Sequence, residues 1–171
     1  LNPVPLMSNQ YAAWMFSQMG LHARAEAQAR RTIARFPDCL QPYFVLGWSA
    51  WYQDRPEEAV ATLEMAIGRS REAFSLSYLA HVYGRLGRCD EARSLLAELE
   101  QLRTRGQAPP IAFATIYAGL GEIEAAFDWL ETAYRLRDGY LFWLSGAPGL
   151  DPLRPDGRFA DLVHRVGVAP A

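Results

Sequence analysis

Apolar residues recur along the chain at helical spacing, in pairs of stretches separated by a short turn. In one such pair, Tyr43, Leu46, Gly47 and Ala50 stand at i, i+3, i+4 and i+7, and a facing apolar stripe follows in residues 59–66. This spacing places each set on one face of a helix. Three further pairs show the same arrangement. The pattern therefore predicts four antiparallel helix pairs.

The pairs keep a common register with a period of 33 or 34 residues. The repeating columns are Ala25, Ala59, Ala92 and Ala126; five residues earlier Gly20, Asp54, Gly87 and Gly121; nine earlier Phe16, Ala50, Tyr83 and Tyr117; and twelve earlier Ala13, Gly47, Ala80 and Ala114. A fixed period of this length is typical of a solenoid. Small residues are expected where paired helices touch, and glycine where the turn needs a positive φ. Asp54 is expected to adopt that backbone and also to cap the next helix, with Glu57 as its capping-box partner and Pro56 in the first turn.

The spacing resembles the tetratricopeptide repeat, whose pattern is W-x2-L-G-x2-Y, then Gly, Ala and Pro. Tyr43-x2-Leu46-Gly47 and Pro37 match it directly, whereas the other repeats lack the first aromatic residue. The resemblance implies an all-α, right-handed α-solenoid of about four helix pairs with a C-terminal helical cap. The expected repeats are residues 6–38, 40–72, 73–105 and 107–138.

The two ends depart from the register. Pro3 lies 34 residues before Pro37, so residues 1–5 are expected to end a truncated upstream repeat. Residues 139–171 are expected to form capping helices and a tail, with a last helix between Asp156 and Gly167. Residues 121–166 also resemble the closing segment of helical-repeat regions in multidomain bacterial signalling proteins. That resemblance implies a regulatory role.

Composition narrows the class of partner. The net charge is −2, and all 17 basic residues are arginine, which we interpret as codon bias. This charge gives no electrostatic reason to expect nucleic acid or an anionic membrane surface. Cys39 and Cys89 form no CxxC motif, and no apolar run approaches 18 residues. We therefore expect a cytoplasmic protein without a metal or other cofactor.

The resemblance implies that the first helix of each repeat lines a concave face where a partner docks. The candidate partner-binding residues are Trp14, Phe44, Trp48, Trp51, Tyr52, His81 and Arg85. Trp48 and Tyr52 are the most informative, because polar residues are usual at their positions in the family. Three covers are open for them: neighbouring repeats through Trp14 and His81, a partner, or a second copy of the chain. His81 and Arg85 are expected to be surface polar residues, with a carboxylate-binding pair as the alternative.

The most direct interpretation is a protein-interaction module that binds a peptide or protein partner, with no catalytic residue. Self-association is the first alternative. An enzyme would need a constellation of the Ser/His/Asp, Walker or Gly-x-Gly-x-x-Gly kind, and the sequence contains none. An RNA-binding helical-repeat protein of the pentatricopeptide type would have a period of about 35 and a basic groove, against which the 33–34 step and the net charge of −2 both argue.

Overall fold

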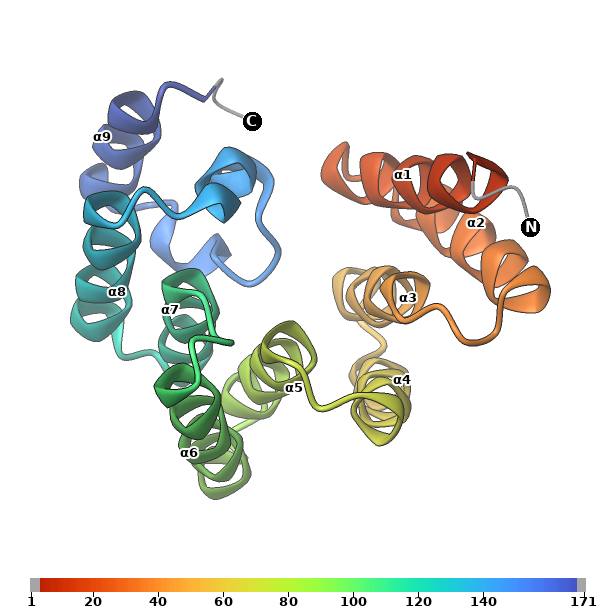
Figure 1. The fold of residues 1–171 in the computed structure, drawn as a ribbon, viewed down its shortest axis with the longest axis horizontal. Coiled ribbons are helices and arrows are strands. Elements are labelled where there is room, and N and C mark those ends of the chain that lie inside the picture. The colour runs from red at the N-terminus through yellow and green to blue at the C-terminus, as the bar shows by residue number, and fades with distance from the viewer. Residues whose placement is uncertain (1–3, 169–171) are drawn as a thin grey trace. The chain divides into compact units, whose positions relative to one another are not determined.

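The computed structural model describes residues 4–168, and every element in that range is helical (Figure 1). The elements are α1 (Val4–Gln18), α2 (His22–Arg35), α3 (Gln41–Tyr52), α4 (Pro56–Arg69), α5 (Ala73–Arg85), α6 (Cys89–Thr104), α7 (Pro110–Leu120), α8 (Ile123–Arg135), the 3-10 helices η1 (Gly139–Gly146) and η2 (Asp151–Leu153), and α9 (Gly157–Val166). The predicted all-α class with consecutive helix pairs is confirmed. Pro3 and the proposed upstream repeat lie outside the described residues.

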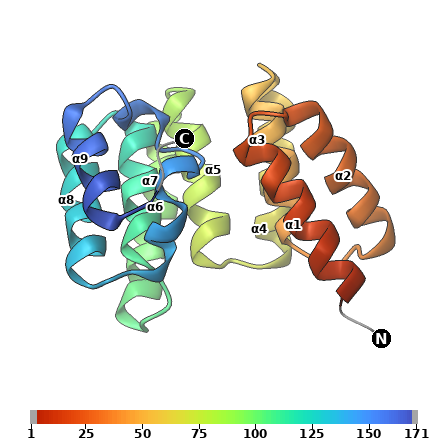
Figure 2. The same cartoon turned by 90° about the horizontal axis from the view of Figure 1, so that it is seen from above.

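The chain divides into two compact units, residues 1–71 and 72–171. In the first, α1 pairs with α2 and α3 pairs with α4, while α2 also packs on α3. In the second, α5 pairs with α6, α7 pairs with α8, and α5 packs closely on α7 (Figure 2). The boundaries of the four repeats given above stay predictions.

The turn inside each helix pair has the same backbone geometry. A backbone N–H just past the turn donates to a carbonyl in the last turn of the first helix: Leu21 to Phe16 (2.9 Å), Arg55 to Ala50 (3.0 Å), Arg88 to Tyr83 (2.9 Å) and Glu122 to Tyr117 (2.9 Å). The intervening residue is left-handed in all four, with φ of 70° at Gly20, 57° at Asp54, 75° at Gly87 and 76° at Gly121. This is the helix-ending motif that glycine favours, so the predicted turn column is confirmed.

The capping role predicted for Asp54 is wrong. The N-cap position of α4 belongs to Arg55, and no side chain caps that helix end. Asp54 lies one residue earlier, in the left-handed turn. A residue in that conformation ends the preceding helix, and its side chain is too far back to reach the first N–H groups of the next one. Pro56 does occupy the first turn of α4 as predicted.

Small residues stand at the closest helix contacts. The four alanines of the repeating column, Ala25, Ala59, Ala92 and Ala126, are fully buried. The closest approach in the second unit is between α5 and α7, where a Cβ built on Gly119 would lie 2.5 Å from the Cα of His81. A Cβ on Gly84 would in turn lie 2.7 Å from the carbonyl carbon of Gly119. These two helices therefore touch backbone to backbone.

The C-terminal segment belongs to the core of the second unit. Leu141, Leu144, Leu150 and Leu153 are buried in one cluster with residues of α7, α8 and α9. The last helix has the predicted ends: the Asp156 carboxylate accepts the Arg158 N–H at 2.9 Å, and Gly167 is left-handed with φ 77°. Two bidentate ion pairs join α9 to α8, between residues exactly one repeat length apart in the chain: Arg158 with Glu124 and Arg165 with Glu131.

Candidate functional site

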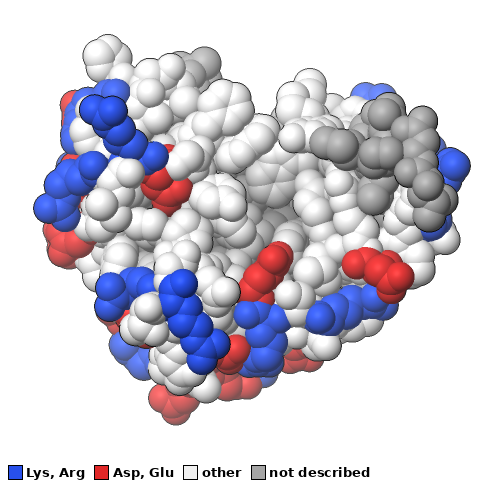
Figure 3. Space-filling model, viewed as in Figure 1, with Lys and Arg blue, Asp and Glu red and all other residues white. Residues whose placement is uncertain are grey.

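Charge is divided sharply between the first and second helices of the pairs. The helices α1, α3 and α7 contain no acidic or basic residue, and α5 contains only His81 and Arg85. The second helices carry the ion pairs, and the charged atoms visible in Figure 3 gather along the edges formed by α4, α6, α8 and α9. A partner that contacts the first helices therefore meets an almost uncharged surface.

The aromatic residues predicted for partner binding in the first unit differ in how accessible they are. Trp48 is 1 % exposed and Phe44 is also buried, so neither presents its ring to solvent. Tyr52 is 37 % exposed, and Trp14 and Trp51 are half-buried. Tyr52, Trp14 and Trp51 can therefore contact a partner directly, whereas Trp48 and Phe44 can act only by supporting them.

Tyr52 is held in place by its ring neighbours. The imidazole of His22 stacks on it with centroids 4.6 Å apart and an interplanar angle of 14°, and the indole of Trp48 lies 5.9 Å away. His22 opens α2 and Tyr52 closes α3, so the stack joins two helix pairs. A partly exposed aromatic side chain that is already ordered loses little conformational entropy when it binds.

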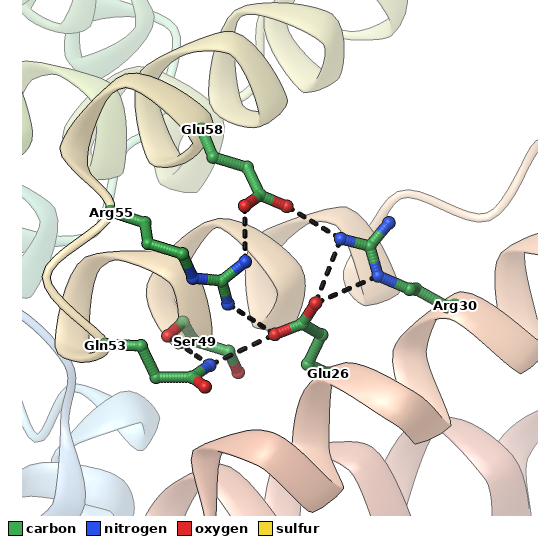
Figure 4. A network of polar contacts seen from close by, with 6 residues as sticks. All are labelled: Glu26, Arg30, Ser49, Gln53, Arg55 and Glu58. Carbon is green, nitrogen blue, oxygen red and sulfur yellow. Dashed lines mark hydrogen bonds and ion pairs between the residues drawn. The ribbon is translucent and has the colours of Figure 1, made fainter.

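A polar network beside this stack joins α2 to the α3–α4 turn (Figure 4). Its members are Glu26, Arg30, Ser49, Gln53, Arg55 and Glu58. The carboxylate of Glu26 accepts from Arg55, from Arg30 at 3.0 Å and from Gln53 at 3.1 Å. Glu58 accepts from the same two arginines, at 2.7 Å from Arg30. Gln53 also donates to the Ser49 carbonyl at 2.9 Å, which fixes the end of α3 next to Tyr52.

The network sets the ionisation of Glu26 and follows the repeat register. Partial burial opposes ionisation, but the hydrogen bonds from Arg55 and Arg30 outweigh it and hold the pKa of Glu26 below its ordinary value. Glu26 follows the alanine column by one residue, and Arg55 precedes the next alanine by four. The second unit repeats this pairing with the charges exchanged, because Arg93 donates to Glu122 at 2.6 Å. Sequence reasoning missed both pairs, although their shared spacing of 29 residues was a readable signal.

In the second unit the prediction that His81 is a surface residue is wrong. His81 is 2 % exposed, and its Nδ1 lies 3.0 Å from the Thr115 carbonyl oxygen on α7. A carbonyl can only accept, so Nδ1 carries the proton. Burial lowers the pKa of His81 to about 4, and the hydrogen bond to Thr115 offsets only part of that effect. Arg85 is exposed, so it faces solvent without His81 beside it to form a carboxylate-binding pair.

The first-helix surface of the second unit is largely covered by its own chain. Residues 139–153 follow α8 and lie against α7, as the blue segment between α8 and α9 shows in Figure 1. Ile111 and Ala118 of α7 are buried in the cluster that contains Leu144 and Leu153. Arg154 ties the segment together by donating to the Ser145 carbonyl and to Asp151. Full burial of each leucine stabilises by about 1.5–3 kcal/mol, so a partner would not displace this segment readily.

Comparison with known proteins places the chain in a family. The model of the tetratricopeptide repeat matches residues 40–65 and 73–98, which contain α3 with most of α4 and α5 with much of α6. These segments coincide with the second and third expected repeats, and the chain is thus a tetratricopeptide-repeat protein. No curated protein matches it. Tetratricopeptide repeats generally mediate protein–protein interaction, and the family is typically a non-catalytic scaffold.

Two further findings concern the described residues. No helix within residues 4–168 is both long and apolar enough to cross a membrane. Within the same range, no three histidine, cysteine or carboxylate side chains come together in a group that could hold a metal ion.

Proposed function

We propose that this chain binds a peptide or protein partner through the first-helix face of its first unit, and that the partner's contacting surface is uncharged and apolar. The observation that carries the proposal is the combination of two charge-free first helices, α1 and α3, with the ordered and partly exposed ring of Tyr52. Trp14 and Trp51 extend this surface, and Phe44 and Trp48 support it from below.

The second unit is a weaker candidate for the same role. Its α7 surface is occupied by residues 139–153, and His81 is buried. Arg85 remains available as a single cation at the end of α5. A partner recognised mainly through carboxylates would find only that one charge on the first helices, which favours apolar over electrostatic recognition.

The experiment starts with selection of peptides from a displayed random library against the chain, and titration calorimetry then measures their affinity. We expect Tyr52→Ser to weaken a selected peptide by about 10-fold or more, since buried tyrosines are frequent hot spots. Met65→Ser is the matched control, because Met65 is equally solvent-accessible but lies on the second helix α4. Affinity should also change little between low and high salt.

Two results would contradict the proposal. One is a library that yields no specific binder. The other is a binder whose affinity is the same for Tyr52→Ser and the wild-type chain. Trp48→Ser is unsuitable as the primary test, because removing a buried indole would cost about 3–5 kcal/mol of folding stability regardless of binding.

The wider role we propose is that of a scaffolding or sensing part within a larger bacterial regulatory protein, without catalytic activity of its own. This rests on the family's usual role and on the resemblance of residues 121–166 to the end of such regions. We further propose a cytoplasmic location, which the two unbridged cysteines, Cys39 and Cys89, favour.

A further inference from the structure

An exposed apolar stripe runs along one side of α1. Tyr11, Met15 and Met19 stand at i, i+4 and i+8, and they are 55 %, 47 % and 65 % exposed. Met19 lies just past the end of α1, but its N–H donates to the Met15 carbonyl at 3.0 Å, so the helical turn continues through it. The three side chains therefore share one face.

This stripe lies on a different side of α1 from the core of the first unit. Ala13 is fully buried in the cluster that contains Ala25 and Val45, and Ser17 is buried as well. Within the first unit α1 packs on α2 and α3 only, which leaves the stripe uncovered. Single exposed apolar residues are common, but three in a row along one helix face are typical of an interaction surface.

We infer that this stripe is the contact between two copies of the chain, with α1 packed antiparallel against α1 of the second copy. The argument rests on charge. The sequence from Leu1 to Leu21 contains no acidic or basic residue. A two-fold contact places a surface against itself, so any charge near the axis would face a like charge. A neutral stripe is self-complementary in this respect, whereas it offers no charge with which to select a charged partner.

The residue types suit the same arrangement. Methionine and tyrosine are enriched at protein interfaces, and methionine side chains adjust to irregular surfaces. Met15 is the middle residue of the stripe, so an antiparallel crossing centred there brings the two copies of Met15 together. Three exposed side chains per protomer are few for a permanent interface, which typically buries about 1,600 Å² or more in total. We therefore expect a weak, reversible dimer. This contact is separate from the Tyr52 surface.

The test is a concentration series of the whole chain, from about micromolar to about millimolar, followed by light scattering and sedimentation. The wild-type chain should pass reversibly from monomer to dimer. Met15→Glu should weaken dimerisation by about 100-fold or more, because the symmetry places two carboxylates at one contact. Met65→Glu is the matched control: Met65 is 53 % exposed on α4, and its substitution should leave the dimer unchanged.

A charge-swap experiment separates the contact from any effect on folding. Met15→Glu and Met15→Arg should each be monomeric alone, and an equal mixture should form a heterodimer. A wild-type chain that stays monomeric throughout overturns the inference and leaves the stripe to another kind of partner. Association that Met15→Glu does not weaken, or assemblies that keep growing beyond two copies, would overturn it as well. Loss of dimer with intact peptide binding would leave the proposed function standing, and the reverse result would leave the dimer standing.

Discussion

The contact between α5 and α7 makes Gly119→Ala the most informative single substitution. In most helices this change is favourable, because alanine has a higher helix propensity than glycine by about 1 kcal/mol. At position 119 the added Cβ would lie 2.5 Å from the Cα and 2.6 Å from the carbonyl oxygen of His81. Ordinary contacts begin at 3.4 Å, so α5 and α7 would have to separate by about 1 Å.

The expected magnitude follows from three effects. Overpacking costs about 1–3 kcal/mol, and the upper end applies because the obstructing atoms are backbone and not a flexible side chain. Separation of the helices also weakens the 3.0 Å hydrogen bond between His81 and Thr115, at about 1 kcal/mol. After the gain in propensity is subtracted, Gly119→Ala should reduce the free energy of unfolding by about 2–3 kcal/mol.

Gly68→Ala provides the matched control. Gly68 lies inside α4 with no atom within 4 Å of the position of an added Cβ, so this substitution should stabilise by about 0.5 kcal/mol. Urea denaturation followed by circular dichroism measures both changes. Hydrogen exchange should show that the loss of protection in Gly119→Ala is concentrated in α5 and α7. A Gly119→Ala variant as stable as the wild-type chain would refute the close backbone contact.

Two further predictions concern pH and the turns. The pKa of His81 is about 4 in the folded state against about 6.5 unfolded, so protonation favours the unfolded chain; stability should be complete above pH 6.5 and fall by about 3 kcal/mol towards pH 4, and His81→Gln should lose this component in denaturation experiments across that range. Asp54→Gly should relieve the left-handed backbone at φ 57° and raise stability by about 0.5–1 kcal/mol, whereas Gly87→Ala at φ 75° should lower it by about 1 kcal/mol; equal effects of the two in thermal melts would contradict the turn geometry.

Much of the local structure could be predicted from the chain because it depends on nearby residues. The helix pairs follow from apolar spacing, and the turn column follows from the need for a left-handed residue after each first helix. The ends of α9 were equally accessible, since Asp156 and Gly167 act on their own helix. The prediction for Asp54 as a cap failed because two local roles competed for it, and the turn backbone excluded the capping geometry.

The candidate site was harder to predict. Helical spacing indicated that α3 is apolar on two faces, but it could not indicate which rings remain accessible. Trp48 and Tyr52 share a face and differ almost completely in exposure, 1 % against 37 %. His81 was expected at the surface because it is polar, yet the glycine at position 119 allows α7 to approach and bury it. The stripe at Tyr11, Met15 and Met19 was not singled out, because exposed apolar residues look like core residues in a sequence.

By itself, the sequence determined the repeat: the period, the helix pairs and the conformation of their turns, all of which arise from interactions within a few helical turns. Only the tertiary structure decided which apolar faces are closed and which are open. It placed residues 139–153 over α7, joined Glu26 to Arg55 across 29 residues, and left Tyr52 and the α1 stripe at the surface. The reason is that burial depends on neighbours distant in the chain, and periodicity records which residues share a face but not what covers that face.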